Sequence, residues 1–146
     1  MFDNAKKICG LKDYGDAPTI YFCDLNIIYP LKRAVLNIIA EGECEVYVGG
    51  DRAKAVNSEN TKYVSYDITS LVAESDFLYI SVKDNGKEHK NCITAEINLD
   101  FAGGLSGRIV SDESWKCTKG NNNTPQICTM GCQLWNMCVD EVRVIE

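Results

Sequence analysis

The sequence predicts an all-β fold, an antiparallel β-sandwich of the jelly-roll type with about eight strands. Two segments alternate apolar and polar residues with the period of two that is typical of strands, Cys44–Val48 and Cys92–Leu99. A third segment, Ala34–Ala40, is an apolar run that only Asn37 interrupts. Short turn signals separate these segments, and no stretch has the repeat of a long helix. An even number of short antiparallel strands at this length favours a jelly roll.

The other strands are predicted from β-branched and aromatic residues. Thr19–Leu25 is the first full strand, and Tyr29-Pro30 ends it because proline has no backbone N–H to donate. Further strands are expected at Lys62–Asp67, Phe77–Lys83, Arg108–Val110 and Val139–Ile145.

Turn residues predict how the strands are joined. Gly49-Gly50-Asp51 indicates a tight turn in which glycine takes a positive φ at little cost. Asp67 and Thr69 are both capable N-cap residues, so we expect a single helical turn at Ile68–Val72. Surface loops are expected at Asp51–Thr61, Lys87–Asn91, Phe101–Gly107 and Lys119–Pro125.

Length and charge limit the classes of protein. A chain of 146 residues is most simply one domain over residues 1–146. Its net charge of −6 argues against a nucleic-acid partner, which needs clustered lysine and arginine. No apolar run approaches the ~18 residues of a membrane span, so no membrane partner is expected. The start of the chain lacks a signal-peptide pattern. We therefore expect a cytoplasmic location, or a fragment of a longer protein.

Eight cysteines are a high count for this length. Without an export signal we expect reduced thiols. Cys23, Cys44 and Cys92 fall within apolar strands, where cysteine acts as a small hydrophobe. The later cysteines leave a disulfide open as an alternative, and their spacing lacks the paired C-x2-C of a structural zinc site. These later residues are Cys117, Cys128, Cys132 and Cys138.

Five phrases carry a resemblance to a known family: Ala5-Lys6-Lys7-Ile8, Tyr21-Phe22, Tyr47-Val48-Gly49-Gly50, Tyr66-Asp67-Ile68-Thr69 and Ser111-Asp112-Glu113-Ser114-Trp115-Lys116. In this order they resemble the galactose-binding-like jelly-roll domains of bacterial glycoside hydrolases. The match is best to the N-terminal non-catalytic domain of α-L-rhamnosidases, a type also found in β-galactosidase-like enzymes. It covers Ala5 to Lys116. The family's opening tryptophan is missing, and Gly49 stands where asparagine is usual.

The resemblance implies a sandwich without a catalytic centre. We expect the matched residues to have structural roles. Asp67 and Thr69 cap a turn with Tyr66 beneath it. Trp115 packs at the edge of the sandwich, and its indole N–H forms a hydrogen bond. The sole histidine, His89, lies among charged residues with no partner phrase, and no pair of carboxylates lies in a catalytic phrase. We therefore expect that the chain is not an enzyme.

We expect a carbohydrate-binding or accessory module of a bacterial glycoside hydrolase. Its expected partners are a carbohydrate, such as plant polysaccharide side chains, and a catalytic glycosidase domain. Sugars are held by an aromatic face and by amides or carboxylates that pair with hydroxyl groups. Loop residues of these kinds are the predicted ligand-binding residues: Asp51, Arg52, Tyr63, Asn85, Asn122, Trp135 and Asn136.

An alternative is a structural or protein-interaction sandwich without a sugar site. The glycine at position 49 and the cysteine-rich tail favour this reading slightly. No cofactor is required by either hypothesis. Calcium is the metal we expect if one is bound, because Asp84, Asn85 and Asp112 offer oxygen ligands.

Overall fold

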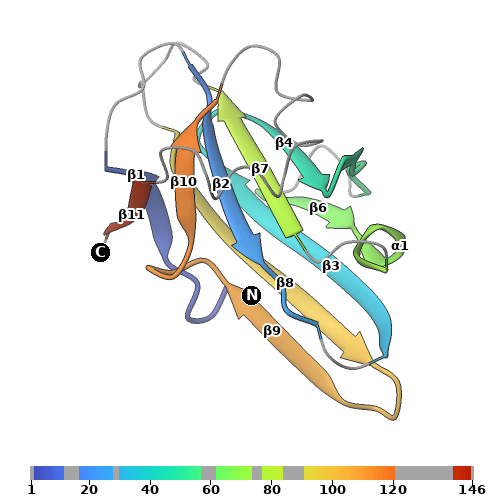
Figure 1. Cartoon of the computed structure of the whole chain (residues 1–146). Helices are drawn as coiled ribbons and strands as arrows, with labels where there is room; N and C mark the ends of the chain where they lie inside the picture. Colours follow the sequence, from blue (N-terminus) through green and yellow to red (C-terminus); the bar gives the residue numbers. More distant parts are fainter. Residues whose placement is uncertain are drawn as a thin grey trace.

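The computed structural model describes residues 2–11, 17–27, 30–56, 62–73, 77–83, 91–120 and 140–145. These residues form eleven strands and one short helix (Figure 1). In chain order the elements are β1 (Lys7–Gly10), β2 (Thr19–Asp24), β3 (Leu31–Ala40), β4 (Glu43–Val48), β5 (Asp51–Arg52), β6 (Val64–Asp67), α1 (Thr69–Val72), β7 (Phe77–Lys83), β8 (Ile93–Phe101), β9 (Ser106–Val110), β10 (Lys116–Lys119) and β11 (Asp140–Ile145).

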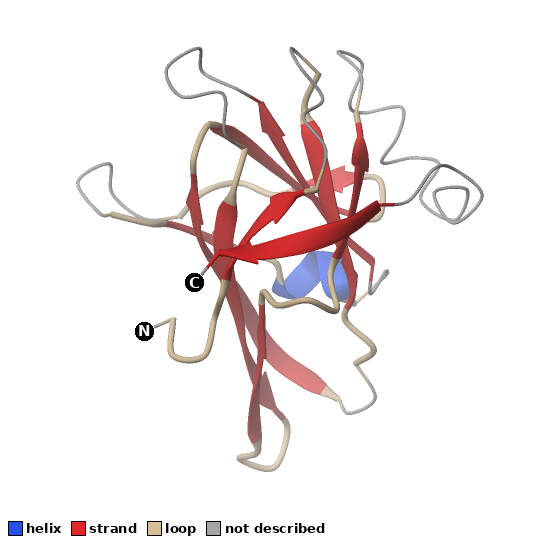
Figure 2. Cartoon of the chain, turned by 90° about the vertical axis from the view of Figure 1, so that its left-hand side faces the viewer, coloured by secondary structure: helices blue, strands red, loops and turns tan. Residues whose placement is uncertain are grey.

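The strands form one curled sheet that folds into two layers. One layer has the order β5-β4-β7-β2-β10-β11, and the other has the order β11-β1-β8-β3-β6 with β9 added to β8. β11 pairs with both β10 and β1, so it closes one side of the sandwich. Figure 2 views the molecule from this closed side, and α1 lies on the opposite side. The free edges of the curled sheet are β5 and β6.

Alternation along the strands supplies the core between the layers. In β3, Leu36 and Ile38 are buried in the main apolar cluster, and Ile97 of β8 lies opposite Leu36 in the register. Trp115 is among the largest fully buried side chains, and its indole N–H donates to the carbonyl oxygen of Val110 at 3.1 Å. The prediction of a bonded indole is confirmed, but the ring lies in the core and not at the edge. The all-β sandwich is therefore confirmed.

All eight predicted strands are present in the described residues, with shifted ends. Three further strands, β1, β5 and β10, were not predicted. Each is short, with at most four residues, so none offers enough alternation to be recognised. The predicted loop Phe101–Gly107 is wrong at both ends, because β8 continues to Phe101 and β9 begins at Ser106.

The turn predictions are confirmed with one correction. Gly49 has φ = 60°, as a tight turn between β4 and β5 requires. α1 is a single turn whose N-cap is Ile68, which makes no side-chain capping bond. The side chain that bonds the start of the helix is instead that of Asp67, one residue before the N-cap. Its Oδ1 accepts the Thr69 backbone N–H at 3.1 Å and the Thr69 hydroxyl at 2.6 Å. These bonds lower the pKa of Asp67, and the charge of Arg33 lowers it further.

The phrase from Ser111 to Lys116 joins the two layers. The Ser111 backbone N–H donates to Ala95 at 2.9 Å, and its hydroxyl donates to the carbonyl oxygen of Lys6 at 2.6 Å. Asp112 accepts the Ser114 backbone N–H at 2.9 Å, which forms the turn before Trp115. This segment thus leads into β10 and bonds both to β8 and to the residues that precede β1.

The prediction of reduced thiols is wrong for one pair of cysteines. Cys9 of β1 and Cys92, which precedes β8, form a disulfide with their Cα atoms 4.4 Å apart. Ile8 pairs with Ile93 in the antiparallel register, so Cys9 and Cys92 are directly opposite one another. This pairing has no local signal in the sequence, because 83 positions separate the two residues. Cys128, Cys132 and Cys138 lie outside the described residues.

No helix among the described residues is long and apolar enough to cross a membrane.

Candidate functional site

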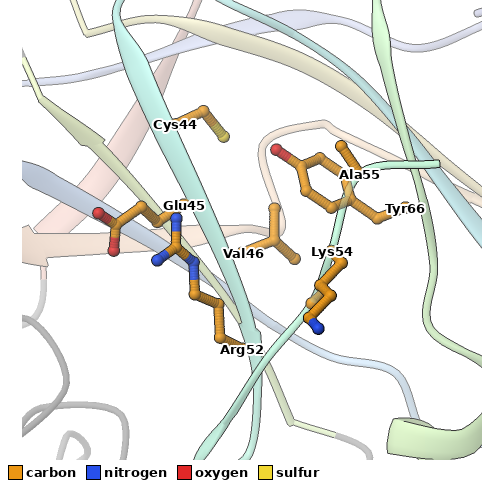
Figure 3. Close-up of a pocket in the computed structure, with 8 residues that line it drawn as sticks. Cys44, Glu45, Val46, Arg52, Lys54, Ala55 and Tyr66 are labelled. Carbon is orange, nitrogen blue, oxygen red and sulfur yellow. The ribbon is translucent and has the colours of Figure 1, made fainter. Parts of the chain in front are cut away.

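A cleft lies where the two free edges of the curled sheet meet. Its volume is about 340 Å³. Ala55, which follows β5, forms an isolated antiparallel bridge with Tyr66 of β6, and this bridge holds the edges together. Figure 3 shows the cleft. The lining residues come from β4, from β5 and the segment after it, and from β6: Cys44, Glu45, Val46, Arg52, Ala53, Lys54, Ala55 and Tyr66.

The β4–β5 hairpin forms one wall of the cleft. Because β4 is a strand, Cys44 and Val46 point to the core side and Glu45 to the other side. The Gly49-Gly50 turn folds β5 back so that Arg52 pairs with Tyr47. The Ala53 backbone N–H then donates to Val46 at 2.9 Å, which fixes the chain beyond β5 against β4.

β6 forms the facing wall. The Val56 backbone N–H donates to Ser65 at 2.8 Å, and this bond continues the bridge between Ala55 and Tyr66. Tyr66 is buried, and its hydroxyl points toward Cys44 (Figure 3). The floor of the cleft therefore carries a hydroxyl and a thiol.

The rim of the cleft is polar and charged. Glu45 Oε2 accepts the Tyr47 hydroxyl at 2.5 Å, which fixes the position of the carboxylate. Arg52 and Lys54 are both exposed. In Figure 3 the Arg52 guanidinium lies on the Glu45 side, whereas Lys54 points away from it. Glu45 and Arg52 thus place a carboxylate acceptor and a cationic donor on the outer side of β4, across the strand from the neutral floor, and Lys54 adds a second cationic donor.

Burial keeps the floor of the cleft uncharged. It raises the pKa of Cys44 to about 12. The hydrogen bond with Tyr66 lowers this pKa, whereas the charge of Glu45 raises it. Burial also raises the pKa of Tyr66 to about 12, and the neighbouring Cys44 raises it further. At neutral pH both groups therefore keep their protons. A thiol in this state is a poor nucleophile, so Cys44 is suited to contact a ligand rather than attack it.

Of the predicted site residues, Arg52 lines the cleft. Asp51 is exposed in β5 beside it but does not line it. Asn85, Asn122, Trp135 and Asn136 lie outside the described residues. Sequence reasoning missed Glu45, Lys54 and Tyr66 as site residues. Glu45 could have been found from the sequence, because the alternation of the predicted strand Cys44–Val48 places its side chain on the outer face. Lys54 lay in a predicted surface loop, and Tyr66 was interpreted as packing only.

Tyr63, also predicted, lies at another place. Its ring meets Phe2 edge to face with centroids 5.7 Å apart. The Phe2 backbone N–H donates to Glu96 Oε2 at 3.0 Å, so this contact covers the sheet face opposite the core. Glu96 is only 2% exposed there. Tyr63 is therefore part of a packed cover and does not line the cleft.

The described residues do not form a metal site. No group of three or more histidine, cysteine, aspartate or glutamate side chains gathers among them. Asp112, one of the predicted calcium ligands, accepts bonds from the Ser114 backbone and side chain. Asp84 and Asn85 lie outside the described residues, so calcium binding there stays a prediction.

Neither a family model nor a curated protein sequence matches the chain. Solved structures do match. The native α-L-rhamnosidase of Aspergillus terreus matches with a TM-score of 0.69 and 18% identity, over 82% of this chain and 17% of that one. The Streptomyces avermitilis α-L-rhamnosidase in complex with L-rhamnose matches with a TM-score of 0.69 and 16% identity, over 98% of this chain and 14% of that one.

A lectin from Pleurotus ostreatus in complex with GalNAc is also similar. It matches with a TM-score of 0.68 and 17% identity, over 100% of this chain and 43% of the lectin. The chain thus spans less than a fifth of the rhamnosidases and under half of the lectin. At such low identity the likeness concerns the fold. The chain has the β-sandwich fold that these rhamnosidases and this lectin contain, and the resemblance predicted from the sequence is confirmed as a resemblance of fold.

Proposed function

We propose that this chain is a non-catalytic carbohydrate-binding domain whose ligand binds in the cleft between β4, β5 and β6. The observation that carries the proposal is the combination of Glu45, Arg52 and Lys54 around one cleft at the open side of the sandwich. A carboxylate and a guanidinium together can pair with neighbouring sugar hydroxyls, since the carboxylate accepts hydrogen bonds and the guanidinium donates them. The cleft volume of about 340 Å³ lies within the range of about 300–1,000 Å³ of small-molecule sites.

The chemistry of the floor supports binding rather than turnover. Cys44 and Tyr66 are held neutral, and a glycosidase needs two carboxylates that face the scissile bond. Among the described residues, Glu45 is the one carboxylate that lines the cleft. A sugar on the outer side of β4 would meet the Glu45 carboxylate and the Arg52 guanidinium, which suits hydrogen bonding to its hydroxyl groups.

The similar structures are consistent with this proposal. One is a lectin in complex with GalNAc, and another is a rhamnosidase in complex with L-rhamnose. In our proposal the chain serves as an accessory module beside a catalytic glycosidase domain, with galactose-type sugars or L-rhamnose as the first ligands to test.

The test is a calorimetric titration of the whole chain with galactose, GalNAc and L-rhamnose. We expect saturable binding of at least one sugar. Glu45→Gln and Arg52→Gln should each weaken it at least tenfold, because each removes a charged partner of the hydroxyl groups. Arg143→Gln is the matched control, since Arg143 is exposed on β11 at the closed side.

Two outcomes would contradict the proposal. Binding that both cleft variants retain would place the sugar elsewhere. Absence of binding, from protein that melts cooperatively, would leave the structural or protein-interaction module as the better hypothesis.

A further inference from the structure

A second hollow lies where β3 begins and the β8–β9 hairpin turns. Both segments are seen at the lower right of Figure 1. Its volume is about 490 Å³. It is lined by Lys32 and Arg33 of β3, by Asp100 and Phe101 of β8, and by Leu105 and two glycines of the turn. Of the predicted ligand-binding residues that the structure describes, none lines this hollow.

A β-bulge brings two cations into this hollow. β3 pairs Leu31 with Phe101 and Arg33 with Asp100, so Lys32 is an extra residue without an opposite partner. In a regular strand two consecutive side chains would point to opposite faces. A bulge changes the direction of a side chain and is common beside functional sites. Here Lys32 and Arg33 both line the same hollow.

The hairpin turn builds an open apolar wall beside these cations. The Phe101 backbone N–H donates to Leu105 at 2.8 Å, which closes the turn. Gly103 and Gly104 have φ of +88° and +83°, and a Cβ on either would meet nothing within 4 Å. A Cβ on Gly107 would lie 3.3 Å from the Phe101 ring, so the ring lies against this glycine. Leu105 is 59% exposed.

The hollow is locally cationic on an acidic protein. Among the described residues that line it, Lys32 and Arg33 outnumber the one carboxylate, Asp100, although the whole chain has a net charge of −6. Among the described residues, neither cation has an ion-pair partner within 4.0 Å. Both are exposed and available to an anion.

We propose that this hollow binds a sugar that carries one carboxylate, a uronic acid residue. The Arg33 guanidinium matches a carboxylate with two parallel hydrogen bonds, and Lys32 adds a point charge. Phe101 and Leu105 offer apolar surface to the C–H face of the sugar ring. The proposal adds a second site and depends on the proposed carbohydrate function only for the class of ligand.

Asp100 narrows the class of anion. Its carboxylate can accept a sugar hydroxyl but repels any additional negative charge. A sulfate or phosphate ion carries more charge and has no apolar face. We therefore expect the hollow to prefer a uronate over both, with an affinity that falls as salt concentration rises.

The test is an NMR titration of the ¹⁵N-labelled chain with galacturonate and with galactose, which differ only at C6. We expect galacturonate to shift the amide signals of Gly103, Gly104 and Leu105 in a saturable way and to bind at least tenfold more tightly than galactose there. Sodium acetate tests the carboxylate alone, and sodium sulfate tests an anion without a sugar. Both should bind at least tenfold more weakly than galacturonate.

Variants separate this hollow from the cleft. Arg33→Gln should weaken galacturonate binding at least tenfold, and Lys32→Gln should weaken it less. Leu105→Ser, at an exposed position, tests the apolar wall without disturbing the core. Arg143→Gln, at an exposed position of β11 on the closed side, is the control and should leave galacturonate binding unchanged.

Several results would overturn the proposal. They are equal shifts from galactose, equal binding of acetate or sulfate, unchanged binding by folded Arg33→Gln and Lys32→Gln variants, and no shift at these amides. Loss of neutral-sugar binding in Arg52→Gln alone concerns the cleft, so failure of one site is distinguishable from failure of the other.

Discussion

Cys9 and Cys92 lie directly opposite one another across β1 and the chain that enters β8, and their disulfide joins these two neighbouring strands of one layer beside the closing strand β11. The register between β1 and β8 in the described residues consists of one pair, Ile8 with Ile93. β1 pairs over four residues with β11 on its other side. The disulfide therefore strengthens the weakest junction of the closed side.

Reduction of this disulfide should destabilise the fold. The bond closes a long loop, with a sequence separation of 83, and the chain-entropy model gives about 3–5 kcal/mol for loops of this size. We expect the free energy of unfolding in urea to fall by that amount when a reductant is added. The Cys92→Ser variant should show the loss without reductant and no further loss with it.

Equal urea midpoints with and without reductant would contradict the prediction. The same bond bears on location, since disulfides are rare in the cytoplasm. Trapping of thiols in intact cells reports the state of Cys9 and Cys92, and a largely oxidised pair would contradict the cytoplasmic location expected from the sequence.

Glu96 should stabilise the fold through its contacts on the outer face of the β3–β8 pair. The carboxylate accepts four donors: Phe2 N–H at 3.0 Å, Asn37 Nδ2 at 3.1 Å, Asn98 Nδ2 at 3.4 Å, and Arg108 Nη1 at 3.5 Å. Glu96→Gln places an amide NH₂ against two of these donors, which leaves buried polar groups unpaired. We expect a loss of about 1–3 kcal/mol in urea unfolding.

Glu113→Gln is the matched control, because Glu113 is exposed and its ion pair with Lys6 lies at the surface. It should leave the stability almost unchanged, because exposed ion pairs contribute little. If the two variants lose the same amount, Glu96 is not held as the structure indicates.

The fold was largely predictable because alternation and turn residues are local signals. β4 and β8 alternate over enough residues to be recognised, and Gly49 marks the turn that the structure contains. β1, β5 and β10 were not predictable, since each is short and exists through its partners. The disulfide depends on the same long-range pairing and had no local signal.

The candidate sites were less predictable than the fold. Arg52 was predicted from its loop, but Glu45, Lys54 and Tyr66 join it only because the two edges of a curled sheet meet. Lys32 and Arg33 are two adjacent charges in the sequence, which by themselves predict only exposed surface. The bulge that turns both into one hollow depends on the register between β3 and β8, which a single sequence does not reveal.

Stability should fall at alkaline pH because of Cys44 and Tyr66. Their folded pKa values are both raised to about 12, from ordinary values of 9.0 and 10.0. Above pH 9 the unfolded chain therefore releases protons that the folded chain keeps. The contribution of these two groups to stability is complete below pH 9 and is lost as pH rises toward 12. Burial raises the pKa of Cys23 to about 12 as well, which adds to the same trend.

Urea unfolding at pH 8 to 11 measures this dependence. Each group contributes at most about 1.4 kcal/mol per pH unit above its unfolded pKa, and less at Tyr66 because water reaches the cleft. Tyr66→Phe should flatten the curve above pH 10, and Cys44→Val should flatten it above pH 9. Parallel curves for wild type and both variants would show that neither group is held neutral by the fold.

The residue at position 49 should accept asparagine but not valine. Gly49 has φ = 60°, and its backbone N–H donates to Phe77 at 2.9 Å. Asparagine tolerates this left-handed conformation, whereas a β-branched residue pays about 1–2 kcal/mol. We therefore expect Gly49→Asn to cost less than about 1 kcal/mol in urea unfolding, and Gly49→Val to cost about 1–2 kcal/mol more.

Gly50→Ala is the matched control, because Gly50 is exposed and is not among the glycines with positive φ. It should be neutral or slightly stabilising. Strain at Gly49 also displaces β5 and hence Arg52, so Gly49→Val should weaken binding in the cleft while Gly49→Asn retains it. If Gly49→Val and Gly49→Asn lower the free energy of unfolding by the same amount, the turn does not need the left-handed conformation. Backbone conformation would then not explain why glycine occupies position 49.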